Sequence, residues 1–253
     1  MPPFRTEAEI LALAQRVMPM LSTGRAKALQ ALIAVVGLEV TDPRFLETIY
    51  RHDPPSRRLP CALRQSSCGY VREYALEEAG LDDPRMKLGG DMRGARAGQP
   101  GVFYPLVLEQ VIAREKGAIR MPDPSRKFDL PIEVDGIIIG CKGGRGVWGK
   151  GGLSEEHVLT VASVQKQISG DAYEIDSIDG GQPGIKTRSR QLVWCGPNSA
   201  ELWAANLNSD GSFAFDPADM RPTVGRRVFC WFDTDALLGL HLFEKWKGVW
   251  HVG

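Results

Sequence analysis

The apolar positions near the start of the chain recur three and four residues apart. This helical spacing runs from Glu7 to about Arg51 and falls into three groups. The groups are separated by Ser22-Thr23-Gly24 and Val40-Thr41-Asp42-Pro43, which are residues that cap or break helices. We therefore expect three amphipathic helices. They form an N-terminal helical lobe over residues 1–55, divided by a turn-rich stretch from a second domain over residues 56–253.

Two further segments have the helical period. One begins at Ser66-Ser67-Cys68, where either serine can cap the helix, and ends at Gly80, a residue typical of helix C-termini. The other covers roughly Tyr104 to Lys116. Both segments precede the part of the chain in which the spacing of apolar residues changes from that of helices to that of strands.

From Ile132 onward the pattern becomes typical of strands. Val158–Val164 and Tyr173–Ile178 flank a polar turn, so we expect them to pair as a hairpin. The other expected strands are Ile132–Ile139, Arg190–Trp194, Leu202–Asn206 and Arg227–Phe232. Helices followed by antiparallel strands predict an α+β fold rather than an alternating β/α sheet.

The charge and length of the chain exclude several classes of function. Its 253 residues carry 31 basic and 31 acidic side chains, so there is no basic excess to attract nucleic acid or anionic lipid. No apolar run approaches the ~20 residues that span a bilayer, and residues 1–5 do not resemble a secretory signal. We expect no nucleic-acid partner, no membrane span, and a protein that is cytoplasmic as synthesised.

The five cysteines argue against a disulfide framework, because their number is odd and no export signal accompanies them. None forms a Cys-x-x-Cys pair, and the four histidines show no metal-ligand spacing, so we expect no metal. Most of these thiols are expected to pack as small buried side chains. Trp194, Trp203 and Trp231 are likewise expected in the core.

A glycine-rich loop carries the alternative interpretation. Gly144 to Gly149 fits the dinucleotide-binding pattern Gly-x-Gly-x-x-Gly. Gly144 to Lys150 also nearly fits the phosphate-binding loop of nucleotide hydrolases, but Gly151 occupies the position that requires Ser or Thr. The loop continues into a β-branched segment and not into a helix, which favours a flexible surface loop. A nucleotide-binding enzyme that uses the Gly140–Gly152 loop remains the alternative.

Cys68 and His157 are the candidate catalytic pair. Cys68 lies in the first turn of an expected helix, where the helix dipole and unpaired backbone N–H groups stabilise a thiolate. His157 lies at the start of an expected strand, where a rigid element would hold a general base. The other three histidines fall in turn-rich or terminal stretches.

The residue opposite His157 depends on the hairpin turn. One turn centre places Asp179 there, and a two-residue Ser169-Gly170 loop places Gln182 there; either side chain would orient the imidazole. In a plainer interpretation Asp179 belongs to a turn and Asp176 is a solvated strand residue. Arg188 and Arg190 are expected to be mostly solvated strand charges, with a carboxylate-binding role left open.

Four short motifs resemble the papain-like cysteine amidases and peptidases of the CHAP and NlpC type. They occur in the family's order from about Pro60 to Gln182: Ser67-Cys68-Gly69-Tyr70-Val71-Arg72, Glu133-Val134-Asp135-Gly136-Ile137-Ile138-Ile139, Glu156-His157-Val158-Leu159-Thr160-Val161, and Ile178-Asp179-Gly180-Gly181-Gln182. The resemblance implies a papain-like fold, with helices packed on an antiparallel sheet. It also implies Cys68 as nucleophile, His157 as base, and Asp179, or alternatively Gln182, as the orienting residue.

The resemblance further implies acyl transfer through a thioester, without a cofactor. The backbone N–H of Cys68, with Gln65 or Ser66, would stabilise the oxyanion, while Tyr70 and Trp148 would line a substrate groove. The implied substrate is a peptidoglycan peptide or another amide. An enzyme of this kind would reach the cell wall by a non-classical route, with an immunity or delivery protein as partner. A non-catalytic binding module of the same fold is the other alternative.

Overall fold

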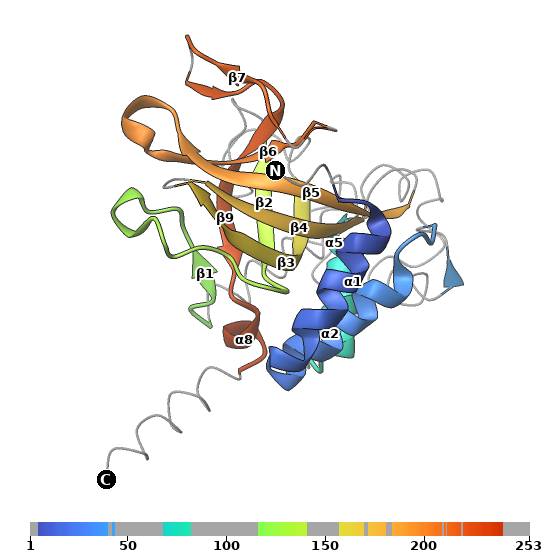
Figure 1. Ribbon diagram of the computed structural model, residues 1–253. Coiled ribbons are helices and arrows are strands. Elements are labelled where there is room, and N and C mark those ends of the chain that lie inside the picture. The colour runs from blue at the N-terminus through green and yellow to red at the C-terminus, as the bar shows by residue number, and fades with distance from the viewer. Residues whose placement is uncertain are drawn as a thin grey trace, which may run out of the picture.

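Helices packed on a closed antiparallel barrel form the molecule (Figure 1). The computed structural model describes residues 5–39, 42–43, 68–81, 116–140, 157–169, 172–180, 184–208, 210, 212–218 and 220–239. The α+β class expected from the order of elements is confirmed. The expected domain boundary near residue 55 lies outside the described residues.

The helices and strands of the described residues follow the chain as two groups. The α-helices are α1 (Glu7–Val17), α2 (Thr23–Val35), α5 (Cys68–Glu78) and α8 (Thr234–Leu237), and the short 3-10 helices are η1 (Met18–Met20), η4 (Pro124–Arg126) and η6 (Pro197–Ser199). The strands are β1 (Ile119–Arg120), β2 (Gly136–Gly140), β3 (His157–Ser169), β4 (Ala172–Gly180), β5 (Ile185–Cys195), β6 (Glu201–Asn206), β7 (Phe215–Asp216), β8 (Arg221–Pro222) and β9 (Gly225–Phe232).

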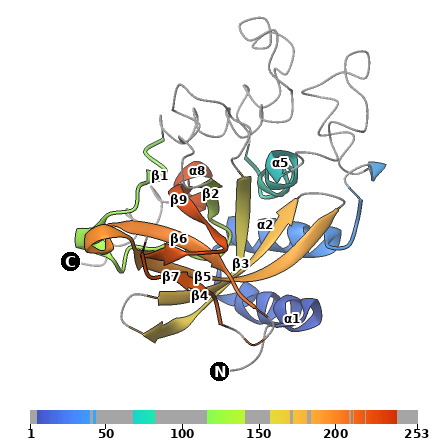
Figure 2. The same cartoon turned by 90° about the horizontal axis from the view of Figure 1, so that it is seen from above.

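Six strands close the barrel. Neighbours pair in the order β9-β2-β3-β4-β5-β6, and β6 pairs again with β9, so the sheet returns to its starting strand. All the pairings are antiparallel, and β1 pairs with the last two residues of β9, beyond those that pair with β6. Closure removes the unpaired edges that an open sheet would present. Helices α1, α2 and α5 lie along one side of the barrel in both views (Figures 1 and 2).

The barrel interior is apolar over most of its length. One cluster of buried side chains draws members from all six strands, including Leu159 of β3, Leu192 of β5 and Leu202 of β6. Trp194 and Trp231 belong to this cluster, and Trp203 is also buried, as expected for core residues. At one end of the barrel the inward-facing side chains are polar, among them His157, Asp179 and Arg190, and the candidate site lies there.

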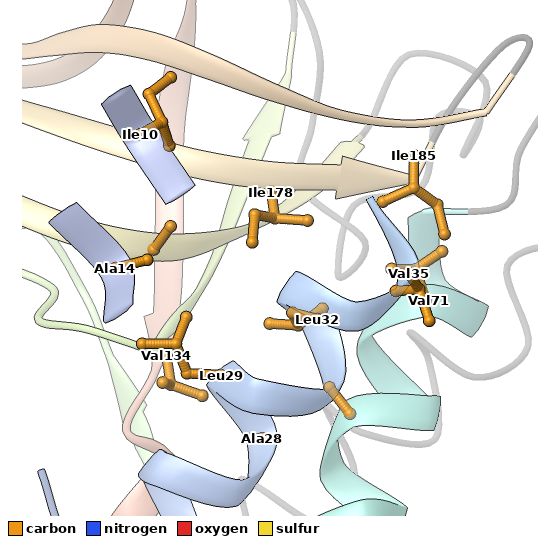
Figure 3. Close-up of a cluster of buried hydrophobic side chains, with 12 residues drawn as sticks. Ile10, Ala14, Ala28, Leu29, Leu32, Val35, Val71, Val134, Ile178 and Ile185 are labelled. Carbon is orange, nitrogen blue, oxygen red and sulfur yellow. The ribbon is translucent and has the colours of Figure 1, made fainter. Parts of the chain in front are cut away.

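A second cluster joins the N-terminal helices to the outside of the barrel (Figure 3). Ile10 of α1 and Leu32 of α2 pack with Val71 of α5, and together they cover Ile178 and Ile185 of the barrel strands. The burial of these side chains removes apolar area from water at both the helix and the sheet surface. The first turn of α5 is consequently held against a rigid sheet.

Buried arginines fix the helices in position. Arg25 of α2 forms ion pairs with Asp135 (2.9 Å), Asp233 (3.4 Å) and Asp235 (2.7 Å). Arg72 of α5 donates to the backbone oxygen of Val134 at 2.9 Å. Buried charges are tolerated when they are paired in this way, and each pair specifies one arrangement of helix and sheet.

Most expected elements occur, with shifted ends. Ser22 caps α2, and Gly80 follows α5 with φ +93°, as predicted. The expected strand from Ile132 is wrong in its first half. Val134 has a positive φ of 71° and Asp135 turns inward to accept from the N–H of Ile132, so β2 begins only at Gly136. The third N-terminal helix and the helix from Tyr104 lie outside the described residues.

Candidate functional site

Cys68 is the first described residue of α5 and is buried, with 6% of its surface exposed. It packs among apolar side chains that include Val158 and Cys230. Its sulfur also accepts hydrogen bonds from the backbone N–H groups of Gly69 and Val158. The thiol therefore sits where a helix start meets a barrel strand, as expected for the candidate nucleophile.

His157 opens β3 and lies between two partners. Its imidazole is hydrogen-bonded to the Cys68 thiol on one side. On the other side its Nε2 lies 3.4 Å from Oδ2 of Asp179, and the side chain is one-fifth exposed. Because Nε2 faces the carboxylate, Nδ1 is the nitrogen available to the sulfur. The structure thus brings together the three residues that the sequence predicted as nucleophile, base and orienting acid.

The strand register that achieves this differs from both predicted registers. Thr160 pairs with Ile178 and Val161 with Ser177, and the pairing shifts beyond Val161 through β-bulges. Continued toward the start of β3, this register sets Asp179 opposite Leu159 and not opposite His157. The Asp179 side chain reaches His157 along the diagonal, a distance that long or polar side chains on one face of a sheet can span.

Asp179 is held by a buried arginine. Arg190 of β5 places Nη2 2.6 Å from Oδ2 of Asp179, and it also donates to the hydroxyl of Ser177. Burial by itself would raise the pKa of Asp179, but the charge of Arg190 and the hydrogen bond from His157 hold the pKa well below its usual range. The carboxylate is accordingly ionised throughout the pH range in which proteins fold.

The expectation that Arg190 is solvated is wrong, since only 4% of its surface is exposed. It faces into the barrel because it is in phase with the interior residues Leu192 and Trp194 of β5, a strand that begins at Ile185, five residues earlier than predicted. A signal for this was present in the sequence. Lys186, Arg188 and Arg190 alternate in phase with Leu192 and Trp194, so all five belong to one face of a strand.

Asp176 was expected to be solvated as well, and it is fully buried. It accepts hydrogen bonds from the hydroxyls of Ser163 and Ser189, each at 2.7 Å, and pairs with Nε of Arg5 at 3.1 Å. Asp176 therefore ties the start of the chain to the outer face of β3, β4 and β5. Its role is structural and separate from the Cys68 site.

The electrostatics of Cys68 and His157 favour a charged pair. Burial raises the pKa of the Cys68 thiol, but the charge and hydrogen bond of His157, with the two backbone N–H groups, bring it below its ordinary value of 9.0. Burial lowers the pKa of His157, yet Cys68 and Asp179 together raise it to about 9. Both shifts act in the direction of a thiolate beside an imidazolium, which is the reactive form of a cysteine nucleophile.

A cavity of about 190 Å³ opens beside the imidazole, at the polar end of the barrel. His157 and Asp179 form part of its wall, together with basic side chains from β5 and β9. The described part of the chain thus gives the site one apolar wall, around Cys68, and one polar wall, inside the barrel mouth.

Several predicted site residues lie outside the described residues: Gln65, Ser66, Trp148 and Gln182. Tyr70 is in the first turn of α5, but its side chain is not described. Of the Gly140–Gly152 loop only Gly140, the last residue of β2, is described. Within the described ranges, no group of three or more His, Cys, Asp or Glu side chains is arranged to hold a metal ion.

No protein-family model matches this chain, and neither the curated proteins nor the solved structures contain a significant match. Among the described helices, none is both long enough and apolar enough to cross a membrane.

Proposed function

We propose that this protein is a papain-like cysteine amidase or peptidase of the CHAP and NlpC type. The observation that carries the proposal is the continuous contact from the Cys68 thiol through the His157 imidazole to the Asp179 carboxylate. A cysteine at a helix start, packed against a histidine and an acid on neighbouring strands of a barrel, agrees with the papain-like arrangement that the four motifs imply.

The reaction begins with the Cys68 thiolate. It attacks the carbonyl carbon of an amide, forming a tetrahedral intermediate whose oxyanion is stabilised by the backbone N–H of Cys68. The imidazolium of His157 then protonates the leaving amine, and a thioester remains on Cys68. In the second half His157 takes a proton from water, the hydroxide attacks the thioester, and the Cys68 thiolate is expelled, which releases the acid product and restores the thiolate–imidazolium pair.

Asp179 acts through His157. Its Oδ2 accepts from Nε2, which keeps Nδ1 directed at the sulfur and stabilises the imidazolium that forms the pair. Arg190 is a positioning residue, because its 2.6 Å contact holds the carboxylate that holds the histidine. The resulting order of contacts is Arg190, Asp179, His157 and Cys68, from the barrel interior to its rim.

The proposed substrate is an amide in a peptidoglycan peptide, and support for it comes from the resemblance of the motifs. As the resemblance implies, we propose Gln65 or Ser66 as a donor to the oxyanion, and Tyr70 and Trp148 as residues of the substrate groove. We also propose that the protein reaches the wall by a non-classical route with a delivery or immunity protein as partner.

The test is digestion of purified peptidoglycan of several chemotypes by the wild type, Cys68→Ala and Cys195→Ala, with mass analysis of the products. Cys195→Ala is the matched control because Cys195 is equally buried but far along β5 from His157. We expect products from the wild type and the control and none from Cys68→Ala. Absence of products on every chemotype would refute the substrate and favour a non-catalytic module, and equal products from Cys68→Ala would refute the nucleophile and place the activity at another site.

A further inference from the structure

We infer that the mouth of the barrel is a binding pocket for a carboxylate of the substrate, within one residue of the amide that is cleaved. This inference rests on the proposed function, and it names an acidic peptide as the substrate class. Its starting point is the cavity of about 190 Å³ beside His157. One ordered water needs only ~10–15 Å³ of such space, so the cavity admits a group of many atoms.

The cavity is strongly basic. Lys186, Arg188 and Arg190 of β5 and Arg226 of β9 line it, and Asp179 is the single carboxylate among the described lining residues. An additional positive charge comes from His157, whose pKa is raised to about 9. The formal net charge of the chain is zero, so this excess of positive charge is local to the cavity. A concave site with low-dielectric walls focuses the electrostatic field of such charges and attracts anions.

Two buried polar atoms, on side chains that line this cavity, have no hydrogen-bond partner among the described residues. They are Oδ1 of Asp179 and Nε of Arg190, on side chains that are only 6% and 5% exposed. Leaving such atoms unpaired is costly, and native interiors contain few of them. One is an acceptor and the other a donor, so the pair calls for a ligand that supplies both kinds of group.

An acidic peptide residue supplies both. Its carboxylate oxygens can accept from Arg190 and the neighbouring basic side chains, and its backbone N–H can donate to Asp179. Near neutral pH the dianion of inorganic phosphate keeps an O–H donor, but it places two negative charges beside Asp179, whereas a peptide carboxylate places one. The mixed wall therefore favours a carboxylate carried by a peptide over a free phosphate.

The position of the pocket links it to the reaction. His157 lines the cavity and is also hydrogen-bonded to Cys68, which is not itself among the described lining residues. A peptide whose carbonyl carbon lies at the sulfur therefore has its adjacent residue within reach of the barrel mouth. Binding there would hold the substrate on both sides of the imidazole, which is the kind of orientation that lowers an activation barrier.

Direct binding can be measured on the full chain carrying Cys68→Ala, which prevents turnover. The probes for calorimetry are N-acetylglycine, its neutral amide N-acetylglycinamide, and inorganic phosphate. We expect N-acetylglycine to bind at least tenfold more tightly than the other two, and Arg226→Gln to remove about tenfold of that affinity, as for loss of one charged hydrogen bond. Arg227→Gln is the matched control, because Arg227 is the next residue of β9, is exposed and does not line the cavity.

The substrate arm compares two peptide amides that differ only in a carboxylate or a carboxamide next to the cleaved bond. We expect kcat/KM of the wild type to favour the carboxylate by about tenfold, and Arg226→Gln to abolish the preference. Cleavage that needs Cys68 but ignores the carboxylate would overturn the inference and leave the proposed function standing. Tighter binding of phosphate than of N-acetylglycine would also overturn it. If neither peptide is cleaved but N-acetylglycine binds through Arg226, the carboxylate pocket is supported and the proposed function fails.

Discussion

Two buried cysteines of this protein lie near an arginine–carboxylate ion pair, Cys195 directly and Cys68 through His157, and their surroundings shift the thiol pKa in opposite directions. Cys68 belongs to a cluster with His157, Asp179 and Arg190. Cys195, at the end of β5, lies near Glu201 and Arg221. In that second cluster Nε and Nη2 of Arg221 each donate to a carboxylate oxygen of Glu201 at 2.7 Å. Burial and a nearby ion pair are therefore common to both.

The histidine is what distinguishes them. Burial and the charge of Glu201 raise the pKa of Cys195 to about 12, and the arginine, already engaged by Glu201, compensates little. At Cys68 an imidazole stands between thiol and carboxylate, and the pKa of the thiol is lowered despite equal burial. A buried thiol thus becomes reactive when a proton acceptor contacts it directly and a fixed carboxylate stabilises that acceptor's charge.

The largest expected effect comes from removing the distinguishing residue. We expect His157→Ala to lower kcat/KM by about 10²–10⁴-fold, because both the proton acceptor and the charge that stabilises the thiolate are lost. Steady-state kinetics on the substrate found by digestion measure this. Retention of activity within a few fold would show that Cys68 does not depend on His157.

The two thiols should also differ in reactivity. With iodoacetamide at pH 7, Cys68 should be alkylated about 10³-fold faster than Cys195, whose pKa of about 12 leaves almost no thiolate. Peptide mass analysis of a time course gives both rates in one sample. Comparable rates for the two sites would mean that burial, and not the imidazole, governs both thiols.

The matched pair Asp179→Asn and Glu201→Gln compares the two carboxylates. Asp179→Asn should lower kcat/KM by about 10–100-fold and destabilise the fold by about 3–5 kcal/mol, because Arg190 is left buried without its counter-charge. Glu201→Gln should leave kcat/KM unchanged. Urea unfolding and kinetics on the same samples separate the two effects, and the conservative variant Asp179→Glu should restore part of the activity if the charge is what matters.

The pH profile gives an independent measure of the same coupling. The kcat/KM of the wild type should fall above about pH 9, where His157 loses the proton that it donates to the leaving amine. Since Asp179 raises the pKa of His157, Asp179→Asn should move this alkaline limb to lower pH. An alkaline limb that stays in place in the variant would separate Asp179 from His157.

The smallest effect is expected at the control cysteine. Cys195→Ala should change kcat/KM by less than about twofold and lower the free energy of unfolding by about 1 kcal/mol, for loss of a small buried side chain. Thermal unfolding and digestion assays measure both quantities. A large loss of activity in this variant would show that Cys195 is not a neutral control for Cys68.

Local patterns were sufficient for the elements and for two of the three residues that meet. Helical spacing predicted α1, α2 and α5, and the alternating pattern predicted all six barrel strands within a few residues of their ends. Cys68 and His157 were found because each stands at the start of an element, and the start of an element depends on nearby residues.

Long-range packing decided the rest. Bulges in β3 give a register that differs from both predicted ones, so Asp179 meets His157 along a diagonal. Closure of β9 onto β6 turned one face of β5 into an interior, and this buried Arg190 beside Asp179. Whether a charged residue on a strand meets water or a partner depends on which strands surround it. Local sequence patterns therefore identified Cys68 and His157 and offered Asp179 as one of two partners, while the closed barrel placed Asp179 and Arg190 together and formed the basic mouth beside them.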